Sequence, residues 1–455
     1  MLRSDTTAPA ILAVAVLLAY FNALGGVFQF DDYNVIVDNP AVHSLAAWFD
    51  SMPGIRPLLK YSYALNWTLN AGPFGFHLFN VVVHLVNSVL VYQVLRALSE
   101  ERNEAAWAPL ASALLFALHP VQTEAVTYVV GRSVSLMALF YLFSVLAWLR
   151  ADRAANPAAC RALSAGLFGA ALLVKETAVT LPFALLLLDA VGARHRFTAR
   201  QMLHRQRWHW LVLVCGLLVI AASPTYRHLL DVSLSARSVS DNLLTQAGAV
   251  CYLAGQLVRP WNMNADPELP VLTAMTPLGF LQVVAIVAIA GFALRNLRQR
   301  TWLALAVLWF LLHLLPTNSM LPRLDVANDR QLYLASIGVF YAIGIGVQKL
   351  MGRATRRWLA GAMAGLALLG LGVATVQRNQ VYGSSVAFWE DAAMKSPHKP
   401  RVANNLGYAY QQAGRLSEAK LAYQQAIELD PDYWRARINL DSLNHPGEPG
   451  NADGH

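Results

Sequence analysis

The segment Phe28-Gln29-Phe30-Asp31-Asp32-Tyr33-Asn34 places two adjacent carboxylates directly after the first apolar stretch of the chain. Like charges this close repel, which raises one pKa unless a cation or a hydroxyl donor lies nearby, and such pairs serve as general bases or cation sites. The plain alternative is an exposed pair that caps the helix that follows. Because carboxylates at the mouth of a membrane bundle are costly to desolvate, the pair predicts a functional site.

The chain around this pair is too apolar for a soluble globular protein. Of its 455 residues 56% are hydrophobic and only 14% are charged, which predicts an all-α polytopic protein in a lipid bilayer. The formal net charge of +8 comes mainly from arginines between apolar segments, so it indicates topology, and no nucleic acid partner is expected. Cys160, Cys215 and Cys251 lie far apart and predict neither a disulfide framework nor a zinc site.

About eleven transmembrane helices are predicted within residues 1–377. The apolar segments are 8–24, 76–95, 107–118, 133–149, 162–174, 178–190, 208–222, 278–294, 302–315, 332–347 and 358–376. The first is interpreted as an uncleaved helix and not as a signal peptide. The arginine-rich turns fall on one side only if residues 242–258 form an interfacial or re-entrant helix. Residues 27–75 are then an outer loop that carries the Asp pair, and the C-terminus lies on the same side.

Residues 378–443 predict a short tetratricopeptide-repeat module. With Pro400 as position 1 of a 34-residue repeat, the consensus positions hold Leu406, Gly407, Tyr410, Ala419, Tyr423, Ala426 and Pro431. Half of a preceding repeat places Ser385, Trp389, Ala392 and Pro397 at equivalent positions. Because one and a half repeats bury little apolar surface, we expect the module to dock on the membrane domain or on a protein partner. The polar tail 444–455 predicts disorder.

Four further polar clusters are expected at the outer ends of spans. They are Arg56 with Lys60, His119 through Glu124 to Arg132, Lys175 with Glu176, and Arg323 through Arg330 to Tyr333. Cations at this depth suggest an anionic ligand such as a phosphate. Simpler interpretations remain open: snorkelling for Arg56, a neutralised turn pair for Lys175 and Glu176, and a helix terminus at His119. Ion pairs of Glu124 with Arg132 and of Asp329 with Arg330 are equally compatible with the sequence.

Together these motifs resemble the transmembrane and tetratricopeptide-repeat-containing O-mannosyltransferase family, as a bacterial relative with a much shortened repeat domain. The residues that carry the resemblance are Phe30-Asp31-Asp32, Arg56-Pro57-Leu58, Gly75 to Asn80 with His77, His84 and Asn87, His119 to Val126, Gly131-Arg132, Lys175-Glu176, and Asp329 to Gly338. The resemblance implies a C-type glycosyltransferase bundle, a polyprenyl-phosphate sugar donor, and catalytic carboxylates at Asp31 and Asp32.

On this basis the sequence predicts an inverting hexosyltransferase that moves mannose or a similar sugar to a protein or glycan acceptor. Asp31 would deprotonate the acceptor hydroxyl, and Asp32 would orient the acceptor or hold a divalent cation, a cofactor that two carboxylates alone leave open. The residues expected to bind the donor phosphate are Arg132, Lys175, Arg330 and Arg56. Further substrate or cleft candidates are His77, His119, Glu124, Glu176 and Tyr333.

The arginine distribution predicts that the catalytic loop and the repeats lie outside, which for a bacterial relative means the periplasmic side of the inner (cytoplasmic) membrane. The alternative is a non-catalytic membrane scaffold that displays the repeat module for protein interaction. A scaffold gives no reason for polar clusters in four separate outer segments, so the enzyme is the preferred interpretation.

Overall fold

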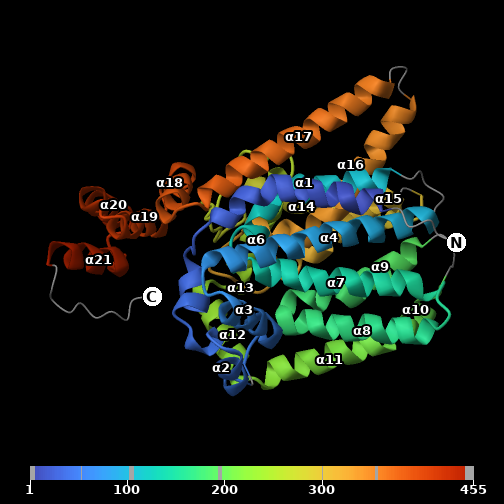
Figure 1. Ribbon diagram of the computed structural model, residues 1–455, viewed down its shortest axis with the longest axis horizontal. Helices are drawn as coiled ribbons and strands as arrows, with labels where there is room; N and C mark the ends of the chain where they lie inside the picture. The colour runs from blue at the N-terminus through green and yellow to red at the C-terminus, as the bar shows by residue number, and fades with distance from the viewer. Residues whose placement is uncertain are drawn as a thin grey trace.

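The structure is a computed structural model that describes residues 6–52, 54–101, 107–192, 197–299, 301–353 and 357–445. Every regular element in these ranges is a helix (Figure 1). The long helices of the bundle are α1 (Thr7–Tyr20), α4 (Pro73–Glu101), α5 (Ala108–Leu118), α7 (Arg132–Ala151), α8 (Pro157–Val174), α9 (Leu181–Val191), α11 (Arg207–Ala222), α14 (Pro277–Arg295), α15 (Thr301–Leu314), α16 (Leu332–Arg353) and α17 (Arg357–Val381).

The other elements connect these helices or lie across the ends of the bundle. These are η1 (Phe21–Gly25), η2 (Tyr33–Val37), η3 (Pro40–Val42), α2 (Leu45–Asp50), α3 (Pro57–Leu69), η4 (Pro120–Gln122), α6 (Thr123–Val126), η5 (Glu176–Thr180), α10 (Ala199–Arg205), α12 (Pro224–Ala236), α13 (Val239–Gln256) and η6 (Asp329–Gln331).

The eleven apolar segments predicted to cross the membrane all fall on helices. Seven spans are long and apolar enough to cross, and α11 with α12 forms an eighth candidate bent by 77°. The apolar helices α5 and α15 are shorter, and α9 has 11 residues, which at 1.5 Å per residue cover about 17 Å of a hydrocarbon core of about 30 Å. The all-α polytopic prediction is confirmed; in the described ranges seven spans have full crossing length, or eight if the bent pair of α11 and α12 is counted as one span.

Small and polar residues allow the helices of the bundle to pack closely. Ser144 on α7 and Ser164 on α8 each donate a hydrogen bond to the other's backbone oxygen, at 2.8 and 2.9 Å. A Cβ atom at Gly344 on α16 would lie 2.2 Å from Ser112 Oγ on α5, so only glycine fits this helix crossing. Such contacts replace the hydrophobic effect as the force between helices in lipid, and they give the outer segments a rigid base.

Exposed ion pairs join the helices at the end of the bundle far from the Asp pair. Arg153 pairs with Glu100 at 3.2 Å, and Asp152 accepts from Arg161 at 2.6 Å and from Arg205 at 2.7 Å. These contacts bring together the last turns of α4 and α7, the start of α8, and α10, as the arginine clusters predicted. Residues 102–106, 193–196, 300 and 354–356, which carry part of those clusters, lie outside the described residues.

Helix α13, at the position of the predicted interfacial or re-entrant segment, does not cross the bundle. Near its start, Asn242 donates to the backbone oxygen of Ser319, 2.7 Å away, just after α15. Near its end, Gln256 Nε2 is 3.3 Å from Asp329 Oδ1, just before α16. Since these two partners lie at the same end of the bundle, α13 runs along that end.

Among its described residues, the segment 27–75 is mostly helical, whereas the sequence suggested a polar loop. In α3, Leu59 and Tyr63 are four residues apart and both are buried, so one face of this helix packs on the bundle. The apolar residues between the polar ones are therefore used for packing. The segment forms a fixed wall next to the Asp pair.

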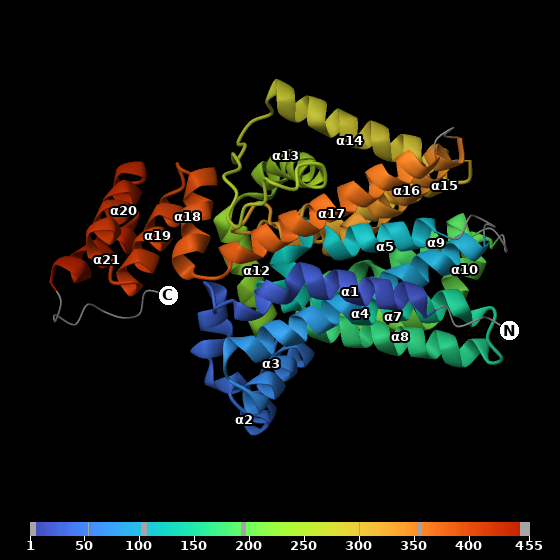
Figure 2. The ribbon, with the colours of Figure 1, turned by 45° about the horizontal axis from the view of Figure 1, so that its top comes forward.

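The C-terminal module contains α18 (Ser385–Lys395), α19 (Pro400–Gln412), α20 (Leu416–Leu429) and α21 (Trp434–Asn444). The predicted helices are present, and residues 446–455 of the predicted disordered tail lie outside the described residues. Figure 2 shows the module beside one end of the bundle, directly after α17. Its apolar core includes Trp389, Val402 and Leu406 and continues into Tyr128 and Tyr382 of the membrane domain.

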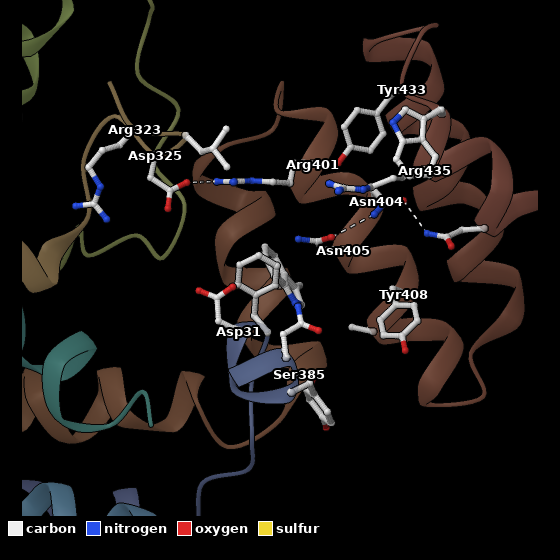
Figure 3. A pocket seen from close by; sticks show the side chains of 18 of the residues that line it. Asp31, Arg323, Asp325, Ser385, Arg401, Asn404, Asn405, Tyr408, Tyr433 and Arg435 are labelled. Carbon is white, nitrogen blue, oxygen red and sulfur yellow. Dashed lines mark hydrogen bonds and ion pairs between the residues drawn. The ribbon is translucent and has the colours of Figure 1, made fainter. Parts of the chain in front are cut away.

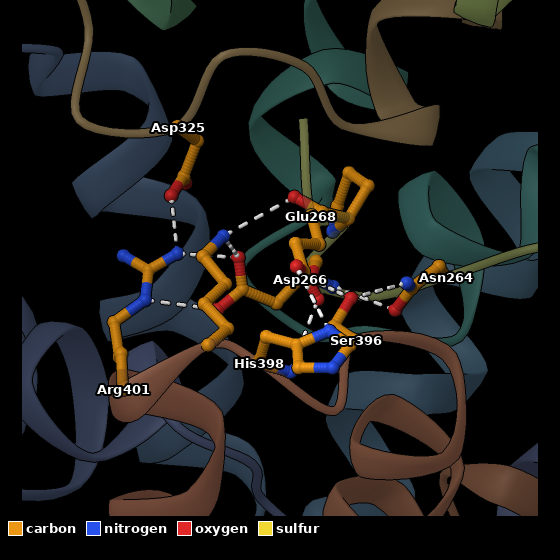
Figure 4. A network of polar contacts seen from close by, with 9 residues as sticks. Asn264, Asp266, Glu268, Asp325, Ser396, His398 and Arg401 are labelled. Atoms are coloured by element: carbon orange, nitrogen blue, oxygen red, sulfur yellow. Dashed lines mark hydrogen bonds and ion pairs between the residues drawn. The ribbon is translucent and has the colours of Figure 1, made fainter. Parts of the chain in front are cut away.

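Polar contacts hold the module against residues 263–268, between α13 and α14 (Figure 4). Arg401 donates to Asp266 Oδ2 at 2.9 Å and to Asp325 Oδ1 at 2.6 Å, and Lys399 also pairs with Asp266. Ser396 Oγ donates to the backbone oxygen of Asp266 at 2.8 Å. The expectation that the short module docks on the membrane domain agrees with these contacts.

Candidate functional site

A cleft of about 730 Å³ lies between the end of the bundle and the repeat module (Figure 3). Its bundle wall includes Asp31, Arg323, Asp325 and Arg330. Its repeat wall includes Asn404, Asn405, Tyr408 and Asn439. Asp31 and Arg330, which are 299 positions apart in the chain, therefore face the same space.

Asp31 is half-buried and is presented to the cleft by a strained turn. Phe30 has φ +40°, a left-handed conformation that a bulky residue rarely adopts. The Asp31 backbone N–H donates to the Tyr128 hydroxyl oxygen at 3.0 Å, and the Phe30 ring packs edge-on against Trp389 with centroids 5.4 Å apart. Burial raises the pKa of Asp31 above its usual value, while the Arg330 charge and a hydrogen bond with Tyr128 oppose the shift. A raised pKa makes this carboxylate a better base near neutral pH.

Asp32 faces the protein interior. It is fully buried, and its two carboxylate oxygens each accept a backbone N–H at 2.8 Å, from Gln29 and from Val130. Burial raises the pKa of Asp32 to about 8 even though these two donors favour the charged form. The side chain connects the Asp31 turn to the segment before α7, which is a structural use of the second carboxylate.

Three basic side chains lie close to one another, and two of them, Arg323 and Arg330, also line the cleft of Asp31. A small cavity of about 30 Å³ is lined by Lys175, Arg323 and Arg330. Lys175 Nζ donates to Ser133 Oγ at 3.3 Å. Burial, followed by repulsion from Arg330, Arg56 and Arg323, lowers the pKa of Lys175 well below its usual value. Burial and the Arg330 charge likewise lower the pKa of Arg323 to about 10. An anion placed here would relieve this repulsion.

Polar atoms without partners line the same small cavity. Both side-chain polar atoms of Gln331 and the Oδ1 atom of Asn328 are buried and have no hydrogen-bond partner among the described residues. A buried polar atom left unpaired costs about 1 to 3 kcal/mol. Of these atoms only Gln331 Nε2 can donate to an anion, whereas the two amide oxygens would accept from a donor group of the same ligand, so the cavity suits a polar ligand whose negative charge faces the cations.

Glu124 holds Arg330 in place. Glu124 Oε2 accepts the Arg330 backbone N–H at 2.9 Å, and its Oε1 atom lies 3.4 Å from Arg330 Nε. The sequence suggested Arg132 as the partner of Glu124 and Asp329 as the partner of Arg330. Since the described structure pairs Glu124 with Arg330, neither of those two ion pairs forms here.

Arg56 and Glu176 bind each other at one side of the site. Arg56 has φ +50° and donates two hydrogen bonds to Glu176, through Nε at 3.0 Å and Nη2 at 2.9 Å. Tyr226 on α12 donates a third at 2.7 Å. Although burial opposes ionisation, the Arg56 charge lowers the pKa of Glu176 to about 2. Lys175 is thus not neutralised by its neighbour Glu176, and Arg56 is already matched by a carboxylate.

Arg132 is fully buried away from the cleft. Its guanidinium donates to Asn80 Oδ1 at 2.7 Å and to the backbone oxygens of Ser62 and Phe76 at 3.1 and 3.0 Å. It also lies 4.3 Å from the centre of the Phe79 ring. With its donors used by α3 and α4, Arg132 is placed to join helices, and the structure does not bring it to the cations at Lys175.

The remaining candidates also lie in the packed interior. His119 Nδ1 accepts the Val121 N–H at 3.2 Å, so its Nε2 donates to the Leu257 carbonyl at 3.2 Å. The Tyr333 hydroxyl contacts His84 Nδ1 at 2.8 Å and accepts from Asn87 at 3.0 Å. The His77 ring packs against Gly26, where an added Cβ would lie 2.8 Å from Nε2. All three are buried, and none lines the cleft of Asp31.

The described residues do not fit a metal site built on the Asp pair. No group of three His, Cys, Asp or Glu side chains in these ranges is arranged to hold a metal ion. Both Asp32 oxygens are engaged by N–H donors, which a cation would have to displace. No step of the proposed reaction is therefore assigned to a metal.

Two family models match the chain. Residues 53–225 match the model of dolichyl-phosphate-mannose-protein mannosyltransferases, and residues 400–433 match the tetratricopeptide repeat. The second match has the register predicted from Pro400. The first match includes Arg56, Glu124 and Lys175, and it ends before Arg330.

Curated relatives agree with these models. The chain is 28% identical to Protein O-mannosyl-transferase Tmtc3 of Drosophila melanogaster, over 94% of this chain and 56% of that protein. It is 25% identical to TMTC3 of Homo sapiens, over 94% of this chain and 52% of that protein. The resemblance to the repeat-containing O-mannosyltransferases is confirmed. The chain spans a little over half the length of these two relatives.

Two solved structures align with most of the chain. The Archaeoglobus fulgidus oligosaccharyltransferase tethered with an acceptor peptide aligns with a TM-score of 0.45 and 11% identity, over 91% of this chain and 59% of that chain. Its apo form aligns with a TM-score of 0.46 and 12% identity, over 84% and 56%.

Arg323, Asp325 and Arg401 were not among the site residues predicted from the sequence. Arg323 stood at the edge of a recognised cluster, so its charge at the end of a span was an available signal. Arg401 lies within the repeat, where a charge normally indicates an exposed helix face. Its role depends on the docking of the module, which no local pattern encodes.

Proposed function

We propose that the protein is a membrane glycosyltransferase with a C-type glycosyltransferase bundle. It transfers mannose, or a similar hexose, from a polyprenyl-phosphate donor to a Ser or Thr hydroxyl of a protein, with inversion at the anomeric carbon. The match of residues 53–225 to the mannosyltransferase model and the names of the curated relatives support this reaction class. One observation carries the proposal: Asp31 shares a cleft with Arg323 and Arg330.

Asp31 acts as the general base. Its carboxylate takes the proton of the acceptor hydroxyl while the hydroxyl oxygen forms a bond to C1 of the sugar. The bond between C1 and the phosphate oxygen breaks on the opposite face, and its electron pair leaves with the polyprenyl phosphate. Attack opposite to the leaving group inverts the anomeric centre.

The cations at Lys175, Arg323 and Arg330 stabilise the departing phosphate. Charge develops on the phosphate oxygens as the bond breaks, and fixed cations in a buried site act on that charge without reorganising. The Gln331 amide supplies a further hydrogen-bond donor in the same cavity. In this proposal Arg56 and Arg132 keep the walls of the site in place, through Glu176 and Asn80 respectively.

The Asp31→Asn variant tests the proposal. Loss of a general base should reduce single-turnover transfer from a polyprenyl-phosphate mannose to a Ser/Thr peptide by about 10²- to 10⁴-fold. The matched control is Asp50→Asn, which changes an exposed aspartate on α2 outside the cleft and should transfer normally. Transfer by Asp31→Asn within a fewfold of the wild-type rate would rule out Asp31 as the base.

We further propose that the cleft and the repeats face the periplasm from the bacterial inner membrane. The arginines at the opposite end of the bundle support this orientation, since basic turns stay in the cytoplasm. In a variant without the native cysteines, Gln424→Cys on α20 should react with a membrane-impermeant maleimide before the inner membrane is permeabilised. Ala155→Cys, in the turn between α7 and α8, should react only afterwards. The reverse order would invert the topology.

A further inference from the structure

The cleft of Asp31 continues without interruption onto the inner face of the repeat module. Figure 3 shows Asp31 on one side and Asn404, Asn405 and Tyr408 of α19 on the other, with Arg435 of α21 beyond them. The space of about 730 Å³ between them is within the range of ligand pockets in proteins. Whatever fills it contacts the base and the repeats together.

Three asparagines form a chain of hydrogen bonds along the repeat wall. Asn439 Nδ2 donates to Asn404 Oδ1 at 3.0 Å, and Asn404 Nδ2 donates to Asn405 Oδ1 at 3.2 Å. The chain ends at Asn405 Nδ2, which has no acceptor among the described residues, and the half-buried Asn405 side chain lines the cleft. A buried donor without a partner is costly, so an acceptor atom from a ligand would stabilise this wall.

The repeat places side chains of the same kind one repeat apart. Asn405 and Asn439 differ by 34 positions, as do Arg401 and Arg435, and all four line the cleft. Arg401 is used for docking, through its pairs with Asp266 and Asp325. Arg435 is exposed, so the second position of the pattern still faces the cleft.

We propose that this cleft binds the acceptor as an extended polypeptide, with the amides of Asn405 and Asn439, joined by the buried Asn404, contacting its main chain and one Ser or Thr hydroxyl reaching Asp31. A primary amide offers N–H donors and a carbonyl acceptor, the same two groups that each peptide unit presents. An extended chain exposes these groups at regular intervals, which suits amides spaced along neighbouring helices. The role of Asp31 in this inference rests on the proposed function, whereas the binding of the polypeptide does not.

Aromatic rings around the cleft provide contacts for the acceptor's side chains. Tyr33 and Tyr408 are 44% and 42% exposed, and Trp434 is 51% exposed. All three line the cleft. Large rings bury apolar surface without loss of many rotamers, so they bind varied sequences. The expected preference is therefore for an unfolded, hydroxyl-bearing segment and not for one fixed sequence.

Direct binding tests the inference without depending on catalysis. The full-length protein in nanodiscs is titrated, in the absence of donor, against a fluorescein-labelled Ser/Thr-rich peptide with blocked termini, and anisotropy is recorded. A second probe has the same side chains but N-methylated peptide bonds. The wild type should bind the first probe at least about tenfold more tightly than the second, because N-methylation removes main-chain donors.

The variants separate the amide chain from the rest of the module. The double variant Asn405→Ala with Asn439→Ala should bind the unmodified peptide at least about tenfold more weakly, and the difference between the two probes should disappear. Tyr408→Ala removes an exposed ring, so it should fold normally and also weaken binding. Asn444→Ala, an exposed asparagine of the same module outside the cleft, should bind as the wild type does.

Several results would overturn the inference. Equal binding of the two probes by the wild type excludes main-chain recognition. Undiminished binding by both the Asn405/Asn439 double variant and Tyr408→Ala excludes the repeat wall. Displacement of the peptide by a mannose oligosaccharide from the wild type, but not from the double variant, would make the cleft a glycan site.

The same titration distinguishes the two proposals. Asp31→Asn should bind the peptide normally while losing transfer. If Asp31→Asn binds the peptide and also transfers sugar, the proposed base is wrong and the polypeptide site stands. If Asp31→Asn abolishes transfer and no variant affects peptide binding, the base stands and the polypeptide site is wrong.

Discussion

The two walls of the cleft are built from different chemistry. The bundle wall carries charges of both signs, among them Asp31, Arg323 and Arg330. The repeat wall carries neutral amides and aromatic rings such as Asn405 and Tyr408, together with Arg401 and Arg435, and no carboxylate of the described repeat residues lines the cleft. Charges in a shielded site act strongly on the charge that develops in a reaction. Amides and rings discriminate shape and hydrogen-bond pattern. The difference suggests that the reaction belongs to the bundle wall and the selection of the acceptor to the repeat wall.

After the loss of Asp31 itself, the largest expected effect comes from the cations of the bundle wall. Replacing Lys175, Arg323 or Arg330 singly by Gln should cost about 2 to 4 kcal/mol of transition-state stabilisation, or roughly 30- to 1000-fold in rate. Because these residues act on the donor phosphate, the loss should be equal for two peptide acceptors of different sequence. Single-turnover transfer and binding of the lipid-phosphate donor measure it. If the Gln variants bind the donor normally and their loss of transfer rate depends on the acceptor, these cations contact the acceptor and not the donor phosphate.

Replacement of Asp32 by Asn and replacement of Asp31 by Asn should have different effects on the stability of the protein. In Asp32→Asn the amide NH₂ meets a backbone N–H where a carboxylate oxygen accepted it, which should destabilise the protein by about 1 to 3 kcal/mol. Asp31→Asn should change the unfolding temperature little, because its carboxylate faces the cleft. Thermal unfolding of both purified variants gives the answer. An Asp32→Asn protein as stable as the wild type but inactive would restore the catalytic role that the family resemblance implies.

The smallest expected effect is a shift in pH dependence. Asp31 must be ionised to accept a proton, so transfer should fall as the pH drops through its pKa, which burial raises above the usual value. The Arg330 charge lowers that pKa, so Arg330→Gln should move the acidic limb of kcat/KM to higher pH. Arg153→Gln, at the far end of the bundle, should leave it unchanged. An acidic limb at the same pH in the wild type and Arg330→Gln would exclude Asp31 as the titrating group.

The sequence was most informative where a local pattern determines the structure. Apolar runs predicted the helices, and the spacing of Gly407, Ala419 and Tyr423 gave the repeat register. The gathering of charged motifs around Asp31 could also be predicted, since charges at span ends have few stable places other than a shared site.

Partners across the fold were not predictable. Because Lys175 and Glu176 are adjacent in the sequence, an ion pair between them was suggested. In the structure Glu176 pairs with Arg56, which is 120 positions away. Arg132 follows a recognised motif, and its burial among α3 and α4 depends on the packing of three helices. No local sequence pattern predicts the positive φ of Phe30, because the contacts of Asp32 with Val130 and of Phe30 with Trp389 hold this turn.

Helix α17 determines the depth at which the cleft lies. Its 25 residues extend about 37 Å, whereas the hydrocarbon core of a bilayer is about 30 Å thick. The buried residues of this helix, Thr375, Arg378 and Asn379, are all in its last two turns, so its lipid-facing length is followed directly by the part that packs beneath the repeats. In the proposed orientation the cleft opens at the level of the lipid headgroups. The proposed lipid-linked donor would then reach it by diffusion within the plane of the membrane, and the proposed polypeptide acceptor would reach it from water, so the two substrates would approach from different phases and need not compete for one entrance.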